Sequence, residues 1–177
     1  MTVTVGSPVP SLALEAYVPG EPEPRSISLA DHAGSWVVLF FYPRDFTFVC
    51  PTELHAFAAL EADFAAEDAV VIAASTDSYW SHEAWFTTHR LLSEVRYPVL
   101  ADTAHRLSNA FGVRCEDGSA LRATYVIDPE GVVRHATVSD QAVGRSVDET
   151  LRVLQALRTG ALCPVAWRPG QPTLEAA

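Results

Sequence analysis

The chain has 177 residues, of which 49% are hydrophobic and 19% charged, so it can bury the core of one domain of ordinary size. Twelve basic against 22 acidic residues give a net charge of −10, which argues against nucleic-acid binding because that function needs a basic surface. All the basic residues are arginine, which excludes chemistry that depends on a Schiff-base lysine or a P-loop lysine.

The sequence predicts neither a signal peptide nor a membrane span. Residues 1–6 carry no positive charge, and the longest apolar run, 36–42, is far shorter than the roughly 20 residues of a membrane helix. Three cysteines, Cys50, Cys115 and Cys163, are an odd number without a C-x-x-C pair, unlike a secreted disulfide framework. We therefore expect a cytoplasmic protein with no membrane partner.

The first half of the chain alternates apolar runs with helical patterns. Frequent prolines near the N-terminus predict short strands and turns. Apolar runs at 36–42, 69–74 and 97–100 are typical of buried strands. Between them, apolar residues at helical spacing predict helices over 51–66 and 78–90. Strands that alternate with helices of this length indicate βαβ units and a partly parallel sheet.

The next segment predicts a short helix and a hairpin. Asp102 can cap a helix that ends at Gly112, since glycine is favoured just past a helix C-terminus. The apolar stretches 123–128 and 132–138 flank a Pro-Glu-Gly turn at 129–131, which is typical of a β-hairpin.

The C-terminal part predicts one more helix and then a tail. Ser146 and Glu149 form a capping-box pattern at the start of an amphipathic stretch, so a helix is expected there. After Gly160 the chain is rich in proline and loses its periodicity. The sum is one α/β domain with a central mixed sheet, followed by a C-terminal extension.

Cys50 lies where a predicted strand gives way to a helix. Proline is preferred at the first helical position, so Pro51 puts Cys50 at or near the N-cap. The free N–H groups and the helix dipole favour an anion there, and the thiolate is the reactive form of cysteine. Helical spacing predicts that the sulfur points inward, because Cys50 shares one face with the residues Glu53, Leu54 and Phe57.

Two residues ahead of the cysteine complete the predicted pocket. Thr47 is close enough for its hydroxyl to hydrogen-bond the sulfur or a bound oxygen, and Pro43 can shield the pocket without offering an N–H donor. The alternative is that Cys50 is a buried small hydrophobic residue, as most free cysteines are. The junction of strand and helix favours a reactive thiol, but it identifies no substrate.

Residues 41–53, with the sequence FYPRDFTFVCPTE, resemble the peroxidatic motif of the peroxiredoxins, which are thiol peroxidases with a thioredoxin-like fold. Its core, P-x-x-x-T-x-x-C, is highly specific. Residues 163–167 are similar to the resolving-cysteine segment of the typical two-cysteine subgroup, which includes bacterial alkyl hydroperoxide reductases. The resemblance covers almost the whole chain, because three further stretches agree in order: 75–78, 143–149 and 163–167.

The resemblance implies a division of the chain and a role for each cysteine. Residues 1–159 would form a thioredoxin-like peroxidase domain, and residues 160–177 a tail with the resolving cysteine. The Cys50 thiolate would attack a peroxide to give a sulfenic acid, which Cys163 would convert to a disulfide. The typical subgroup implies a disulfide between subunits, but the sequence alone does not distinguish it from an intrachain bond. An incidental tail cysteine is the alternative for Cys163.

Three charged residues match the family's active site, Arg122 as a catalytic residue and Glu53 and Arg145 as supporting ones. Arg122 matches the active-site arginine, whose guanidinium can donate to the sulfur and to peroxide oxygens. Glu53 and Arg145 match positions that orient this arginine. The alternative for both arginines is a solvated surface charge, as most arginines are.

The resemblance also implies the partners. Hydrogen peroxide or an organic hydroperoxide would be the substrate, and thioredoxin or a flavoprotein disulfide reductase the electron donor. The working unit would be a homodimer, with a ring of dimers as a further assembly. No cofactor is expected, and the six histidines lack the spacing of a metal site. A one-cysteine peroxidase with an external resolving thiol and a redox-regulated holdase chaperone or ring scaffold remain as alternatives.

Other candidates are weaker. Acidic neighbours of Cys115 disfavour its thiolate, so we interpret it as a bystander. His55 is five residues beyond Cys50 and faces another side of the helix. Trp80 and Trp85 are expected to be core or interface aromatics.

Two departures concern oxidation of the thiol. Residues 87–93 lack the Gly-Gly-Leu-Gly insertion of the oxidation-sensitive members of the family, and the sequence ends at Ala177 without their Tyr-Phe arm. We therefore expect an enzyme that resists over-oxidation.

Overall fold

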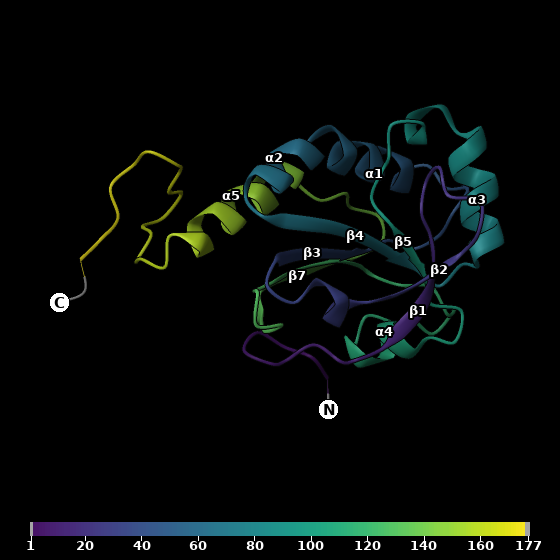
Figure 1. Ribbon diagram of the computed structural model, residues 1–177, viewed down its shortest axis with the longest axis horizontal. Coiled ribbons are helices and arrows are strands. Elements are labelled where there is room, and N and C mark those ends of the chain that lie inside the picture. Colours follow the sequence, from purple (N-terminus) through teal and green to yellow (C-terminus); the bar gives the residue numbers. More distant parts are fainter. Residues whose placement is uncertain (1, 176–177) are drawn as a thin grey trace.

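The computed structural model describes residues 2–175 and contains a seven-stranded mixed sheet with the order β2-β1-β5-β4-β3-β6-β7 (Figure 1). The central pairs β3–β4 and β4–β5 are parallel, and the four remaining pairs are antiparallel. The parallel pairs are joined through helices, as parallel strands require a crossover. The strands are β1 (Ala13–Tyr17), β2 (Arg25–Ser28), β3 (Trp36–Phe41), β4 (Ala69–Ser75), β5 (Val99–Ala101), β6 (Arg122–Ile127) and β7 (Val133–Ser139).

Helices cover both faces of the sheet (Figure 1). On one face lie α1 (Cys50–Ala59), α2 (Glu61–Ala66), α3 (Tyr79–Thr88) and α5 (Val147–Arg158). The other face carries α4 (Arg106–Ala110) and a 3₁₀ helix, Leu29–His32. A second 3₁₀ helix, Arg90–Leu92, follows α3.

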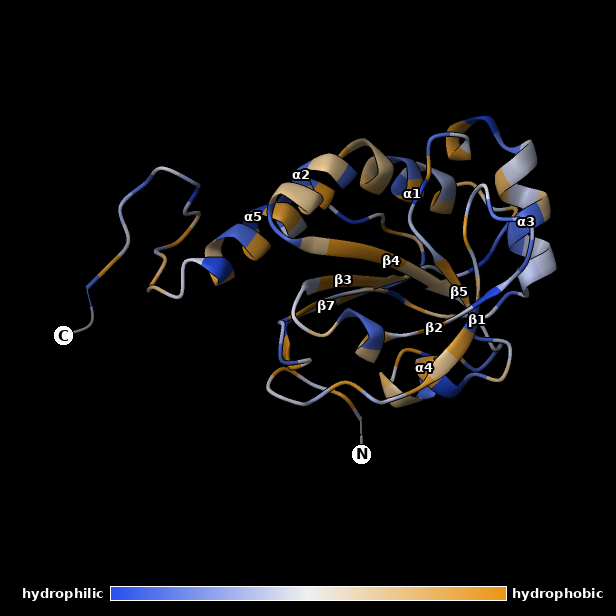
Figure 2. Ribbon diagram, viewed as in Figure 1, coloured by the Kyte–Doolittle hydropathy of each residue, from blue (hydrophilic) through white to orange (hydrophobic). Residues whose placement is uncertain are grey.

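Strand β3 is buried on both faces, as its continuous apolar run predicts. Val38 and Phe40 belong to the core under α1 and α5, whereas Val37, Leu39 and Phe41 belong to the core on the α4 side. Successive side chains of a strand point to opposite faces, so a strand between two helical layers must be apolar at every position. Figure 2 shows the hydrophobic colour concentrated in these central strands.

The helix predicted over 51–66 is two helices, α1 and α2, which meet at Leu60. The Leu60 N–H donates to the carbonyl of Phe57, three residues earlier, at 3.3 Å. Such i to i−3 bonds tighten the last turn of a helix and end it. The spacing of apolar residues does not change at this point, which is why the sequence pattern missed the break.

The predicted capping box of α5 is half formed. The Ser146 hydroxyl accepts a hydrogen bond from the Glu149 N–H at 3.2 Å, as an N-cap residue should. The Glu149 carboxylate binds the Arg152 guanidinium at 2.7 Å instead of returning to the Ser146 backbone. A charged partner three residues away on the helix competes successfully for the glutamate.

Asp102 caps the short helix from a distance. Its carboxylate accepts from the N–H groups of Leu107 and Ser108 at 3.0 and 2.7 Å, although the helix itself begins at Arg106. Gly112 follows the helix with φ +66°, the left-handed conformation that glycine adopts without steric cost. Asp102 and Gly112 therefore lie at the start and the end of this helix, as the sequence predicts.

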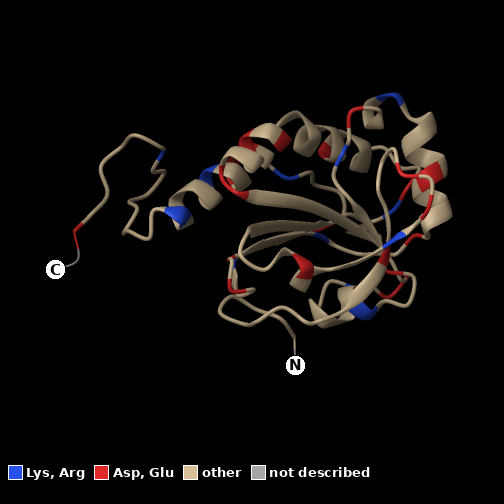
Figure 3. Ribbon diagram, in the orientation of Figure 1, with Lys and Arg blue, Asp and Glu red and all other residues tan. Residues whose placement is uncertain are grey.

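The chain beyond α5 leaves the body of the molecule (Figure 1). Within it, Leu162 and Leu174 form an isolated antiparallel bridge. No helix within residues 2–175 is long and apolar enough to cross a membrane. Acidic segments are distributed over the outer helices and loops (Figure 3). The net negative charge is therefore spread over the surface.

Candidate active site

Cys50 is the first residue of α1, and its side chain is fully buried. Arg122 is the first residue of β6, and the adjacent Ala123 pairs with Phe41, the last residue of β3. This register brings Arg122 next to the loop that leads from β3 to Cys50. As a result, the Arg122 Nη1 donates to the Cys50 Sγ at 3.4 Å. The sulfur therefore lies beside a cationic donor and at the N-terminus of a helix.

A buried carboxylate joins the two arginines. The Glu53 Oε2 accepts from the Arg122 Nη1 at 2.5 Å, and the Glu53 Oε1 accepts from the Arg145 Nε at 2.9 Å. All three side chains are at most 7% exposed. One carboxylate and two guanidinium groups leave an excess of one positive charge. This excess positive charge lies next to the Cys50 sulfur.

Arg145 also ties the loop before α5 to the sheet. Its Nη2 donates to the Phe41 carbonyl at 2.6 Å, and its Nη1 donates to the Ala123 carbonyl at 2.8 Å. Burial lowers the pKa of Arg145, whereas the negative charge of Glu53 opposes this effect. An arginine remains charged under such conditions, so this side chain is a permanent cation inside the cluster.

The buried cysteine borders a hollow of about 230 Å³. Pro43 and Thr47 both line this hollow, as predicted for the pocket. The Thr47 hydroxyl, however, donates its single hydrogen to the Arg44 carbonyl at 2.9 Å, so it does not donate to the sulfur. A carbonyl three residues back is within reach in a tight loop, which the spacing to Cys50 did not reveal. The lining residues are Pro43, Arg44, Thr47, Phe48, Val49, Cys50, Arg122 and Gln141.

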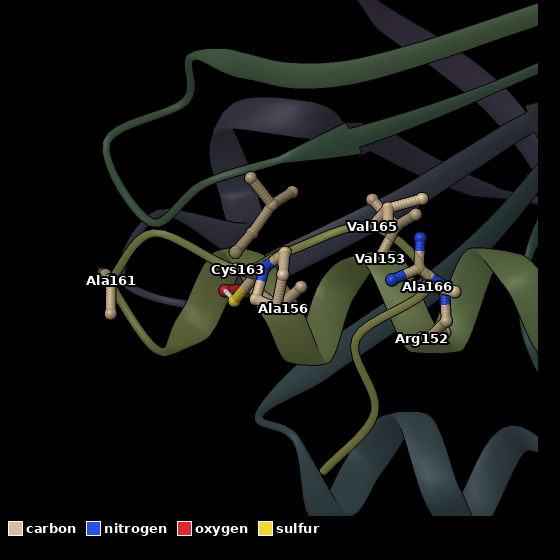
Figure 4. A pocket seen from close by; sticks show the side chains of 10 residues that line it. Arg152, Val153, Ala156, Ala161, Cys163, Val165 and Ala166 are labelled. Atoms are coloured by element: carbon tan, nitrogen blue, oxygen red, sulfur yellow. Dashed lines mark hydrogen bonds between the residues drawn. The ribbon is translucent and has the colours of Figure 1, made fainter. Parts of the chain in front are cut away.

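Cys163 lies in a different cavity, of about 590 Å³, between α5 and the tail (Figure 4). Its Sγ lies 3.7 Å from the Ala156 carbonyl oxygen and 3.4 Å from the Thr159 hydroxyl. All three cysteines are free thiols. Within this chain, therefore, the structure does not bring Cys50 and Cys163 together.

A buried polar cluster supports the loop that carries the pocket. The Asp45 carboxylate accepts from the Tyr42 hydroxyl at 2.7 Å and lies 2.8 Å from the His82 Nδ1. The Asp45 N–H in turn donates to Asp77 at 2.9 Å. Burial, reinforced by Asp45, raises the pKa of Tyr42 well above its usual value, so its hydroxyl stays protonated. No sequence pattern marks this cluster, because His82 and Asp77 reach Tyr42 and Asp45 only in the folded chain.

The neighbouring residue Phe46 has φ +55°, an uncommon conformation for a residue other than glycine. Its ring contacts that of Trp85, with 5.9 Å between the ring centroids. The contacts of Asp45 hold the backbone just before this strained position. The pocket-lining loop is therefore anchored to α3 and to the end of β4.

The weaker candidates have other partners. His55 faces the second 3₁₀ helix, where its Nδ1 lies 3.1 Å from the Leu91 carbonyl oxygen. Trp85 is a core residue, whereas Trp80 is 70% exposed and does not belong to the core. Cys115 is partly buried and accepts a hydrogen bond from the Gln141 amide. Among the residues that the structure describes, no group of three or more metal-ligating side chains is close enough to hold a metal ion.

Comparison with known proteins supports the prediction of a family. Residues 5–136 match the model of the AhpC/TSA family. A peroxiredoxin of Caenorhabditis elegans, prdx-2, is 48% identical over 179 residues, which cover 97% of this chain and 88% of that protein. The peroxiredoxin tpx1 of Schizosaccharomyces pombe is 45% identical over 183 residues, which cover 99% of this chain and 94% of that protein.

Solved structures agree with the fold. The reduced 2-Cys peroxiredoxin of Plasmodium vivax superposes with a TM-score of 0.91 at 34% identity, covering 96% of this chain and 91% of that one. AhpC of Mycobacterium tuberculosis gives a TM-score of 0.86 at 38% identity, covering 95% of this chain and 100% of that one. The prediction of a thioredoxin-like fold with a mixed sheet flanked by helices is confirmed.

Proposed function

Because this chain belongs to the AhpC/TSA family and is a peroxiredoxin, an enzyme that reduces peroxides with a cysteine thiol, we propose that Cys50 is its peroxidatic residue. The observation that carries the proposal is the contact of the Cys50 Sγ with the Arg122 guanidinium beside a hollow that admits a small molecule. A thiolate held next to a permanent cation is the arrangement that nucleophilic attack on a peroxide requires.

In the first step the Cys50 thiolate attacks one oxygen of the bound peroxide. A sulfur–oxygen bond forms while the oxygen–oxygen bond breaks, and the electron pair moves to the leaving oxygen, which takes up a proton. The products are a Cys50 sulfenic acid and water, or an alcohol from an organic hydroperoxide. Within residues 2–175 the Nη2 of Arg122 makes no hydrogen bond, so it remains available to donate to the peroxide.

We assign Cys163 as the resolving residue. Its thiol attacks the sulfenic sulfur, so that a disulfide forms and water is released. Cys163 and Cys50 line separate pockets, and the tail that carries Cys163 leaves the body of the molecule beyond α5 (Figure 1), which favours a Cys50 on a partner subunit. Similarity to the 2-Cys peroxiredoxin of Plasmodium vivax supports the same assignment. The working unit would then be a homodimer, which can build a ring of dimers.

The disulfide has to be reduced for another turnover. We propose thioredoxin or a flavoprotein disulfide reductase as the electron donor, because a relative from Echinococcus granulosus, 44% identical over 183 residues, is a thioredoxin peroxidase. Thiol-dependent turnover also fits a cytoplasmic location, where reductants keep cysteines reduced.

Peroxide consumption in the presence of thioredoxin and its reductase tests these assignments. We expect Cys50→Ser to abolish consumption, and Cys163→Ser to allow oxidation of Cys50 but to block turnover. Peroxide consumption that survives in Cys50→Ser would contradict the proposed function. Full turnover in Cys163→Ser would instead indicate a peroxidase with one essential cysteine.

Non-reducing electrophoresis after one equivalent of peroxide tests the disulfide. A covalent dimer should form in the unmodified protein and in Cys115→Ser, and should be missing in Cys50→Ser and Cys163→Ser. Oxidised protein that runs as a monomer and holds a Cys50–Cys163 bond by mass spectrometry would contradict the pairing between subunits.

A further inference from the structure

Arg122 is held at a second point, away from the sulfur. Its Nε donates to the backbone carbonyl of Gln141 at 2.7 Å, whereas its Nη1 contacts Glu53 and Cys50. Gln141 lies two residues beyond Ser139, the end of β7, which pairs with Arg122 in the sheet. Two anchors on different nitrogens restrict the rotation of the guanidinium plane, which a single anchor would leave free.

The side chain of Gln141 is itself anchored to a turn, residues 115–120. Its Nε2 lies within hydrogen-bond distance of three acceptors, the Ser119 hydroxyl at 2.7 Å, the Ala120 carbonyl at 3.2 Å and the Cys115 Sγ at 3.3 Å, which share its two hydrogens. The Ser119 hydroxyl gives its own hydrogen to Asp117, at 2.5 Å, so its oxygen can only accept from Gln141. These partners determine the orientation of the amide, with its NH₂ group toward the 115–120 turn.

The 115–120 turn also contacts Arg44, a second arginine that lines the pocket. The Nη2 of Arg44 donates to the Asp117 carbonyl at 3.0 Å and to its carboxylate at 3.1 Å. Hydrogen bonds from Ser119, aided by Arg44, lower the pKa of Asp117 to about 2, so the carboxylate is ionised at neutral pH. The turn therefore contacts Arg44 directly and Arg122 through Gln141, and both arginines line the hollow beside Cys50.

The loop that contains Gln141 ends at Arg145. There the Arg145 N–H and Nε both donate to the Glu53 Oε1, at 3.0 and 2.9 Å. This short loop therefore supplies the Gln141 carbonyl that binds Arg122, and it also contains Arg145. Gln141 anchors its beginning to the 115–120 turn, and Arg145 anchors its end to the charged cluster.

We propose that Gln141 is a positioning residue of the peroxidase site. Its amide, held by the 115–120 turn, keeps the Gln141 carbonyl on the Nε of Arg122 and so aims the guanidinium at Cys50 and at a bound peroxide. The inference rests on the proposed peroxidase function and deepens it. It also gives Cys115 a part in the site, as a hydrogen-bond acceptor within the turn. Small displacements of a preorganised donor are costly to catalysis, so this support matters for the rate.

The test replaces the amide and keeps the length of the side chain, in the variant Gln141→Met. The rate constant for oxidation of Cys50 by hydrogen peroxide in a single turnover should fall about threefold to tenfold, the range expected for loss of one hydrogen-bonded anchor. The pH profile for alkylation of Cys50 by iodoacetamide should move to higher pH, because a mobile Arg122 stabilises the thiolate less well.

Gln155→Met is the matched control. The Gln155 amide lies on α5 and donates to Glu67 at 3.1 Å, so it takes no part in the active site. This variant should keep both the oxidation rate and the alkylation profile. If Gln141→Met also keeps both, or only unfolds at a lower temperature, the proposal is wrong.

Ser119→Ala tests the connection to the turn from its other side. Ser119→Ala should also slow the oxidation of Cys50 by hydrogen peroxide. The double variant should be little slower than Gln141→Met alone, since both changes remove the same contact. Fully additive losses would overturn the proposed connection. The alkylation profile needs no peroxide, so it tests the role of Gln141 even if the chain proves inactive as a peroxidase.

Discussion

At the start of β6, one guanidinium contacts a sulfur, a carboxylate and a carbonyl. Arg122 can do this because its nitrogens form a planar fork with five donors and because it stays charged when buried. The charges of Glu53 and of a Cys50 thiolate would each be costly to bury alone, since Glu53 is 3% exposed and Cys50 is fully buried. Each of these buried charges is stable because the others are present.

Replacement of this arginine by lysine tests the importance of the fork. An ammonium group on a flexible stem cannot bind Glu53, the Gln141 carbonyl and the sulfur in one fixed geometry. We therefore expect Arg122→Lys to slow oxidation of Cys50 by about 100-fold to 1,000-fold, the usual effect of losing an oxyanion donor. Stopped-flow measurement of tryptophan fluorescence can follow this step. Arg158→Lys, on the far end of α5, is the control and should react at the normal rate. A normal rate in Arg122→Lys would mean that charge alone suffices.

Among the elements, α3 supports the active-site loop most directly. It contributes His82, which is fully buried and lies against Asp45, and Trp85, which packs on Phe46. The loop runs between the end of β3 and the start of α1, where its own backbone is strained at Phe46. A helix that is anchored in the core thereby determines where Pro43 and Thr47 lie.

Removal of one partner of this buried pair should therefore destabilise the whole fold. We expect His82→Ala to lower the free energy of unfolding by about 3–5 kcal/mol, because it empties a fully buried site and leaves the Asp45 carboxylate with the Tyr42 hydroxyl as its remaining side-chain partner. Urea denaturation measures this change. His55→Ala, which removes a partly exposed histidine, is the comparison and should cost less than about 1 kcal/mol. Equal stability of the two variants would show that the buried pair contributes nothing.

On the scale of the whole molecule, the two proposed redox thiols belong to separate cavities. Cys50 is enclosed at the start of α1, and Cys163 lies between α5 and the tail (Figure 4). Formation of the proposed disulfide would require Cys50 to leave its buried position and Cys163 to leave its own cavity. The rate of that rearrangement competes with attack by a second peroxide, which would convert the sulfenic acid to a sulfinic acid.

We expect this rearrangement to be fast. The chain passes from α3 to the second 3₁₀ helix through His89 alone, with no inserted segment that could cover the start of α1. Intact mass after treatment with excess hydrogen peroxide should show the disulfide as the main product. In Cys163→Ser, the same treatment should yield sulfinic acid at Cys50, because the sulfenic acid persists there. Equal amounts of sulfinic acid in both proteins would contradict rapid resolution.

The local pattern of residues was sufficient for several features of this protein. It predicted the buried β3, the hairpin β6–β7, the cap at Ser146 and the position of Cys50 at a helix start. All of these depend on neighbours within a few positions: alternation along a strand, a turn, a capping hydroxyl, or a proline next to the cysteine. The thioredoxin-like fold and the family followed from the specific motif around that cysteine.

Only the tertiary structure decided which groups meet around the sulfur. The Arg122 Nε contacts a carbonyl 19 positions away, and His82 contacts an aspartate 37 positions away. The Thr47 hydroxyl bonds to a carbonyl in its own loop instead of the sulfur. Backbone carbonyls are identical at every residue, so no sequence pattern marks the one that Arg122 binds. Such contacts depend on strand register and on how loops pack, and these emerge only when distant parts of the chain come together.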